Sequence, residues 1–183
     1  RIADKKDSAL DRLADSKLTR EQIEAVWANA DDEYFVRESA DNIAWHTEAI
    51  ANFSGDGPLI SFKDSGTQNP DVGATQVFIY TRNADFLFAN STAAFEELNL
   101  NIHGARIFTS ANDFCMDTYT VLEASGKPVG NQPGRLEEIK NVLTHNLKFG
   151  NQAIKPVRVR RSRKEKYFSK PIELSIHNPS GKD

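Results

Sequence analysis

The stretch TQVFIY, residues 75–80, is rich in β-branched and aromatic side chains and predicts a buried strand. Apolar residues then recur at helical spacing over residues 86–98, and Asn99 follows where a left-handed residue would end that helix. Two more strand-like runs, 101–109 and 114–122, are separated by a short polar turn and predict a hairpin.

A second helix and a last strand complete the pattern. Apolar residues from Leu136 to Leu147 recur at helical spacing, and Ile172 to His177 is strand-like. The order from residue 75 to residue 178 is therefore β-α-β-β-α-β, in which two helices cover one face of a four-stranded antiparallel sheet. We expect an α+β protein of this ferredoxin-like class.

The residues ahead of the sheet predict helices. Thr19 and Gln22 form a capping box, and an apolar stripe runs from Ile23 to Tyr34 as one helix. Ser39 caps the next helix, which carries Ile43, His46 and Ile50 on one face. We assign residues 1–54 to this helical segment and the Gly- and Pro-rich residues 55–74 to a linker, despite a short apolar patch at 59–62.

Composition points to a soluble protein of ordinary kind. Of the 183 residues 39% are hydrophobic and 27% charged, and the net charge is −3. No apolar run is long enough to span a membrane, and the single Cys115 fits a reducing compartment, so we expect a cytoplasmic location. Eight basic residues lie within 155–170, which we treat as the connection to the last strand; a nucleic-acid partner is the weaker interpretation.

Catalytic and metal-binding motifs are missing from the sequence. It contains no phosphate loop, no dinucleotide fingerprint, no nucleophile elbow and no zinc signature. His46, His103, His145 and His177 fall on four different elements without ligand spacing. We therefore expect neither a catalytic site nor a metal site in this chain.

Three reactive side chains have structural interpretations. His46 lies on a buried stripe and is expected to be a packed imidazole bonded to a nearby carbonyl. Cys115 lies within a strand and is expected to be a core residue. Asp117, on the same strand, is expected to be hydrogen-bonded, with Arg106 as a plausible partner.

The turn 82–85 between the first strand and its helix is the best candidate for a binding site. Free amides of a helix N-terminus gather there and suit a carboxylate or phosphate. A cap made by Asn83 or Asp85, with no ligand, is the alternative.

Several stretches resemble known proteins. Residues 75–80, 82–89, 100–109 and 116–122 resemble the ACT domain, a βαββαβ regulatory module that commonly binds amino acids. More narrowly, 32–37 (DEYFVR) and 43–47 (IAWHT) are similar to the segment ahead of the first ACT domain in the bacterial PII uridylyltransferase and uridylyl-removing enzymes. Residues 160–163 (RRSR) and 167–171 (YFSKP) are similar to the segment after that domain.

The resemblance implies a regulatory fragment of a larger enzyme. In that family a nucleotidyltransferase domain and a hydrolase domain precede two ACT domains that sense glutamine. The implied effector is glutamine, and the implied partners are the PII signal protein, the other domains of the enzyme and a second ACT domain. Magnesium and UTP are implied for the whole enzyme and no cofactor for this chain.

The resemblance also implies a glutamine site. The α-carboxylate would lie on the amides of Asn83, Ala84, Asp85 and Phe86, and the amine would meet acceptors from Asp85 and from the carbonyls at Asn101 and Ile102 of a neighbouring strand or a paired domain. The family's Asp-Arg-Pro-Gly turn is replaced here by residues 83–86, which lack the Gly. The alternative function is a purely structural module that pairs with another ACT domain and binds nothing.

The helical segment is expected to contact the sheet domain. Trp45 and Ile43 lie about 200° apart around their helix, so the segment would bury two sides. Trp45 is predicted to pack between the helical segment and the sheet domain.

Overall fold

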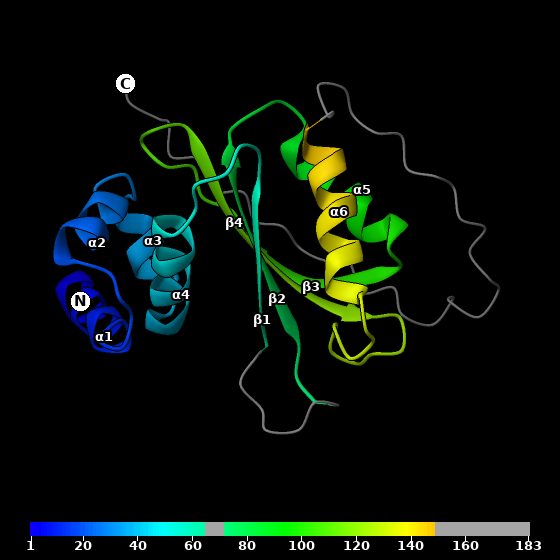
Figure 1. Ribbon diagram of the computed structural model, residues 1–183, viewed down its shortest axis with the longest axis horizontal. Coiled ribbons are helices and arrows are strands. Elements are labelled where there is room, and N and C mark those ends of the chain that lie inside the picture. Colours follow the sequence, from blue (N-terminus) through cyan, green and yellow to red (C-terminus); the bar gives the residue numbers. More distant parts are fainter. Residues whose placement is uncertain (65–71, 149–183) are drawn as a thin grey trace, which may run out of the picture.

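The computed structural model describes residues 1–64 and 72–148 and has three layers (Figure 1). Four helices form the first layer, a four-stranded sheet the second, and two helices the third. In chain order the elements are α1 (Ile2–Arg12), α2 (Arg20–Trp27), α3 (Asp32–Arg37), α4 (Ala40–Ala51), β1 (Leu59–Asp64), β2 (Thr75–Arg82), α5 (Leu87–Glu97), β3 (Leu100–Arg106), β4 (Phe114–Glu123) and α6 (Arg135–Lys148). The predicted α+β class, with helices ahead of an ACT-like sheet, is confirmed.

The sheet is antiparallel throughout, with the strand order β1-β2-β4-β3. Strand β1 lies inside the stretch 55–74, so the prediction of a linker is wrong for residues 59–64. Pairing with β2 overrides the surrounding Gly and Pro residues, because it places Ile60 opposite Ile79 in the core. The predicted last strand at 172–177 and the basic run 155–170 lie outside the described residues.

One face of the sheet packs against α5 and α6. The centre of this interface is an apolar cluster whose side chains are inaccessible to solvent. The buried residues here include Val77, Ile79, Ala94, Phe95, Tyr119, Val121, Ile139 and Leu143.

The other face packs against the helical segment. The two regions share one core rather than meeting at a surface contact, because residues of β2 and β4 and of the turn after β3 lie among those of α1 to α4. Members of this core include Ile23, Trp27, Tyr34, Phe35, Ile43, Phe78, Phe108 and Met116.

Local sequence signals set most helix ends. The amide of Thr19 donates to Gln22 Oε1 at 2.8 Å and the amide of Gln22 to Thr19 Oγ1 at 3.2 Å, which confirms the capping box. Ser39 caps α4 as predicted, through the amide of Asn42. The single helix predicted through Tyr34 is wrong, because the chain breaks after Trp27 and Asp31 caps the new helix α3. Asn99 adopts the predicted left-handed conformation, with φ 58°.

In the described ranges 1–64 and 72–148, no helix is both long and apolar enough to cross a bilayer.

Candidate functional site

The turn between β2 and α5 is tied to the hairpin of β3 and β4. The backbone amide of Asn83 donates to the carbonyl of Asp113 at 2.8 Å, and its side-chain amide donates to Asp113 Oδ1 at 3.2 Å. The cap residue of α5 is Phe86, and no side-chain hydrogen bond caps the helix there. The alternative of a cap made by Asn83 or Asp85 is therefore wrong.

Phe86 has an unusual backbone conformation for a bulky residue. Its φ of 63° is left-handed, and its side chain is 51% exposed. Glycine adopts this conformation without a steric penalty, whereas a side chain at Cβ strains it. Position 86 thus has a backbone conformation that is typical of Gly.

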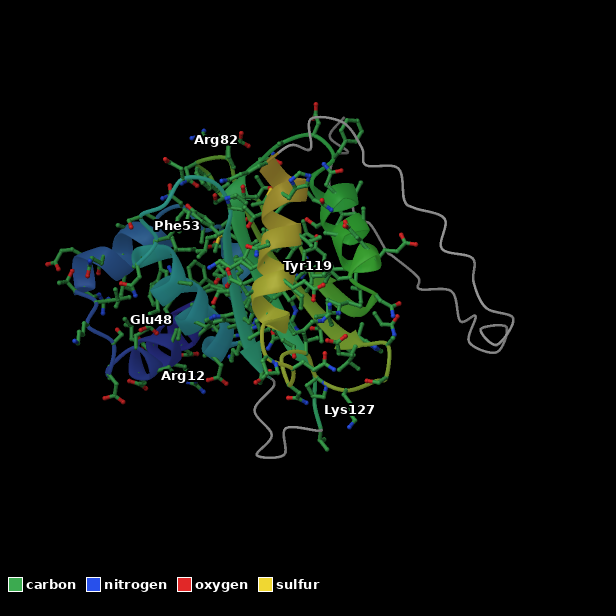
Figure 2. All side chains as sticks on the ribbon, turned by 45° about the vertical axis from the view of Figure 1, so that its right-hand side comes forward. Arg12, Glu48, Phe53, Arg82, Tyr119 and Lys127 are labelled. Atoms are coloured by element: carbon green, nitrogen blue, oxygen red, sulfur yellow. The ribbon has the colours of Figure 1, made fainter. Side chains whose placement is uncertain are left out.

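The structure does not bring the six predicted ligand residues together. Arg82 pairs with Phe114 at one end of β4, whereas Asn101 pairs with Leu122 at the other. The length of β4 between these two pairs amounts to roughly 25 Å. Figure 2 marks these ends with Arg82 at the top and Lys127 at the bottom. Residues 83–86 and 101–102 of this domain therefore cannot contact one small ligand. A shared site would need a second domain that brings its own residues to the turn at 83–86.

Buried polar groups lie on the α5 and α6 face of β4. The Cys115 thiol is 3.3 Å from Asn83 Oδ1, and burial raises its pKa to about 11, so the thiol form persists. Burial also raises the pKa of Asp117 to about 7, and its Oδ1 has no partner in the described part of the chain. The Tyr119 hydroxyl is likewise buried without a partner there.

The predicted pairing of Asp117 with Arg106 is wrong. Arg106 lies opposite Thr118, so its side chain is on the other face of the sheet from Asp117. It forms an ion pair with Glu38 of the helical segment, with Nη1 and Oε2 3.2 Å apart.

On the face toward the helical segment, the register aligns side chains in three cross-strand rows. Their character changes from apolar to polar along the strands. The inner row contains Leu59, Tyr80 and Met116; the middle row Ser61, Phe78, Thr118 and Arg106; and the outer row Lys63, Gln76, Thr120 and Gly104.

Helix α4 is docked on the middle row. The Trp45 indole donates to Ser61 Oγ at 2.9 Å and its ring meets the Phe78 ring edge-on. The predicted contact of Trp45 with the sheet is therefore confirmed. The His46 ring stacks on Phe78 with centroids 3.9 Å apart, and its Nε2 lies 3.1 Å from the hydroxyl of Thr118.

His46 is the packed imidazole that the sequence predicts. Its Nδ1 lies 2.8 Å from the Tyr34 hydroxyl, so hydroxyl groups take the place of the expected carbonyl. Burial lowers the pKa of His46 to about 3, and the charges of Lys63 and Arg106 act in the same direction. The ring is therefore neutral at physiological pH and serves packing.

A chain of polar contacts crosses the sheet through α4. Glu38 is buried, and its Oε2 accepts from Arg106 and, at 3.1 Å, from the side-chain amide of Asn42. The same amide donates to Gln76 Oε1 at 2.8 Å, and Asn42 Oδ1 accepts from Lys63 Nζ at 3.1 Å. Residues from β3, β2 and β1 are thus linked through Glu38, which precedes α4, and Asn42 in the first turn of α4.

An open cleft of about 790 Å³ lies beside this polar chain. Its floor is the outer row, and its walls come from α1, α4, β1 and the end of β3. Among the described residues, no group of His, Cys, Asp and Glu is placed to hold a metal ion. The charged residues that line it are Arg12, Asp41, Glu48, Lys63, Asp64 and Arg106.

Sequence reasoning missed Glu38, Asn42, Lys63 and Gln76. One signal was available: Gln76, Thr118 and Thr120 fall at even-numbered positions of two strand-like runs, which places polar side chains on a single face of a sheet. The partners on α4 could not be paired with these positions, because the docking of a helix on a sheet is not encoded in local spacing.

Comparisons with known proteins cover nearly the whole chain. Residues 1–49 match the family model described as uridylyltransferase GlnD fifth domain. The bifunctional uridylyltransferase/uridylyl-removing enzyme of Stutzerimonas stutzeri is 42% identical over 93% of this chain. The enzymes of that name from Pseudomonas fluorescens and Azotobacter vinelandii are 39% and 41% identical over 97% and 93% of the chain.

These matches cover only part of each relative. The chain spans about a fifth of the length of the curated relatives it matches, 19% and 20% for the first two. No solved structure matches the chain. Over nearly all of its length, the chain is thus a relative of one segment of the bifunctional uridylyltransferase/uridylyl-removing enzymes.

Proposed function

We propose that this chain is a regulatory segment of a bifunctional uridylyltransferase/uridylyl-removing enzyme that responds to glutamine. The observation that carries the proposal is the similarity of about 40% identity to one segment of proteins with that name. In the complete enzyme, magnesium and UTP would serve the transferase, and the PII signal protein would be the substrate. The chain by itself is expected neither to transfer UMP to PII nor to remove it.

The turn between β2 and α5 is the proposed glutamine site. Helix α5 begins there without a side-chain cap, so its first amides are available to a carboxylate. Asp85 would supply one acceptor for the ligand amine. The other acceptors would be carbonyls of a paired domain at the positions that correspond to Asn101 and Ile102, because Asn101 and Ile102 of this domain lie at the far end of the sheet. Glutamine would then bind where two domains meet.

A modest coupling free energy between ligand binding and domain arrangement is enough for such a site to regulate the enzyme. A ligand shifts an equilibrium between two domain arrangements only by its differential affinity for them, and coupling of about 1 to 3 kcal/mol is common. Glutamine occupancy would bias the packing of this segment on the catalytic domains and so favour uridylylation or its reversal.

A calorimetric titration of the complete enzyme with L-glutamine tests the proposal. Ala84→Pro removes one amide of the turn and should abolish the binding. Ala124→Pro is the matched control, because Ala124 is the second residue of an exposed turn closed by Gly126 and Glu123, a position that favours Pro. Equal binding by both variants would overturn the placement.

A purely structural pairing module is the second candidate function. Phe86 and Phe88 are 51% and 48% exposed at the start of α5, which gives the turn an apolar surface that another domain could cover. Failure of millimolar glutamine to bind the enzyme, together with loss of domain pairing in a Phe86→Ser, Phe88→Ser variant, would favour this candidate.

A further inference from the structure

The outer row forms the floor of a cleft that α4 leaves uncovered. Asn42 contacts Lys63 and Gln76 at one side of this row. At the other side Gly104 faces open space, because a Cβ built there would meet no atom within 4 Å. The cleft volume of about 790 Å³ is in the range typical of small-molecule sites.

The cleft holds a cation, Lys63, that forms no ion pair with a carboxylate of the described residues. Within 1–64 and 72–148, no carboxylate lies at ion-pair distance from Lys63 Nζ, which contacts Asn42 and lies 5.6 Å from the centre of the Trp45 ring. Burial lowers the pKa of Lys63 despite the opposing charges of Asp41 and Glu38, so an anion in contact with it would further stabilise its charged form. Arg106 uses one of its five N–H groups on Glu38 and keeps half of its side chain exposed.

Carboxylates line the same cleft. Asp41 is paired with Arg12, whereas the Asp64 side chain lies on the opposite face of the sheet from Lys63, where it accepts a bond from the hydroxyl of Thr75. Glu48, one helical turn beyond Trp45, lines the cleft as well and forms no ion pair with any described residue. Lys63 on β1 and Glu48 on α4 are therefore a positive and a negative group of the cleft that form no ion pair with the described residues.

We propose that this cleft binds a small zwitterion of the α-amino-acid type. The ligand carboxylate would lie between Lys63 and Arg106, and its ammonium group would face Glu48. Its side chain would lie over Thr120 and Gly104, where the floor is open. This site is separate from the turn at 82–86, so it does not rest on the proposed function.

Binding here would favour the docked arrangement of the helical segment. The walls come from α1 and α4, and the floor comes from the sheet, so the complete site exists only when the two are together. A ligand that binds only the docked form stabilises it by mass action. The cleft would then make the contact between segment and sheet sensitive to ligand concentration.

The test is an NMR titration of the 183-residue chain with L-alanine, L-serine and L-glutamine at millimolar concentration. We expect shifts in the amides of Lys63, Gln76, Gly104 and Thr120 and in the indole of Trp45. N-acetyl and carboxamide derivatives, which each lack one charge, should bind at least about tenfold more weakly. Absence of shifts at these positions with all three amino acids would overturn the proposal.

Two variants separate this site from its alternatives. Gly104→Val fills the open floor of an edge strand without a clash and should remove binding while the fold persists. Lys63→Gln should weaken binding by at least about tenfold, whereas Lys140→Gln, on an exposed position of α6, should not. Ala84→Pro should leave these shifts intact even if it abolishes glutamine binding at the turn. Full binding by Gly104→Val would also contradict the proposal.

Discussion

The two faces of the sheet are covered by helices in different ways. Helices α5 and α6 meet the sheet through an apolar core, with Ile139 and Leu143 fully buried. The helical segment meets the opposite face through the three cross-strand rows, whose side chains change from apolar in the inner row to polar in the outer row, where the open cleft lies. Apolar contacts without directional bonds hold a layer in place, whereas a polar margin offers groups that a ligand can bind. The second interface is therefore the one suited to regulation.

The largest expected effect on stability comes from removing a ring at the centre of the interface between the sheet and the helical segment. Phe78→Ala deletes the ring on which His46 stacks and which Trp45 meets edge-on, and should cost about 3 to 5 kcal/mol of unfolding free energy. Urea unfolding followed by tryptophan fluorescence reports the helical segment, because both tryptophans lie in it, and circular dichroism reports the whole chain. The shared core predicts that the two curves coincide.

Phe95→Ala is the control for that comparison. It removes a ring of similar burial from the α5 and α6 face and should cost a similar amount. If Phe78→Ala shifts the fluorescence transition alone, the helical segment unfolds independently and the single shared core is refuted.

The apolar face should show the stronger pH dependence, through Asp117. Burial raises its pKa in the folded chain to about 7 from an ordinary value of 3.8, so the folded state binds a proton that the unfolded state releases between these values. Stability from this group is fully present below about pH 4 and is lost as the pH rises to about 7. A shift of this size corresponds to at most about 4 kcal/mol.

Asp117→Asn isolates this contribution. The difference in unfolding free energy between the variant and the parent chain should grow in favour of the variant as the pH rises from about 4 to about 7. Asp113→Asn, in an exposed turn, serves as the control. A difference that does not change with pH would show that Asp117 is ionised in the folded chain.

The ion pair of Glu38 and Arg106 is expected to have a smaller effect. Arg106→Met leaves a buried carboxylate with one donor fewer, and should cost about 1 to 3 kcal/mol, reduced by the exposure of the Arg side chain. Glu38→Gln combined with Arg106→Met should recover part of this loss, because no buried charge remains. A double-mutant cycle in urea measures the coupling, and additive losses would contradict a direct interaction.

Local signals in the sequence predicted most of the elements. The capping box at Thr19, the Ser39 cap and the left-handed Asn99 each depend on a few neighbouring residues, and all three are confirmed. Strand β1 was missed because its evidence is its partner β2, which lies further along the chain. Elements that depend on distant pairing are invisible to a pattern taken over short windows.

The candidate site was less predictable than the fold. Helix N-terminus chemistry pointed to residues 82–86, but spacing along the chain could not show that Asn101 lies at the opposite end of the sheet. The sidedness of Asp117 and Arg106 was missed for a related reason: it depends on the register between two strands, which the bulge between Ile102 and Gly104 shifts by one residue.

The smallest effect concerns the turn at the edge of the apolar face. Phe86→Gly removes an exposed ring from a left-handed position, and should stabilise the chain by about 1 kcal/mol because glycine adopts that φ without strain. Phe88→Gly is a matched control, since Phe88 is similarly exposed but lies within α5, where glycine costs about 1 kcal/mol. Thermal unfolding should therefore shift in opposite directions for the two variants. If both are destabilised, the packing of Phe86 outweighs its backbone strain, and the ring, rather than the backbone shape of the turn, is the feature that this position preserves.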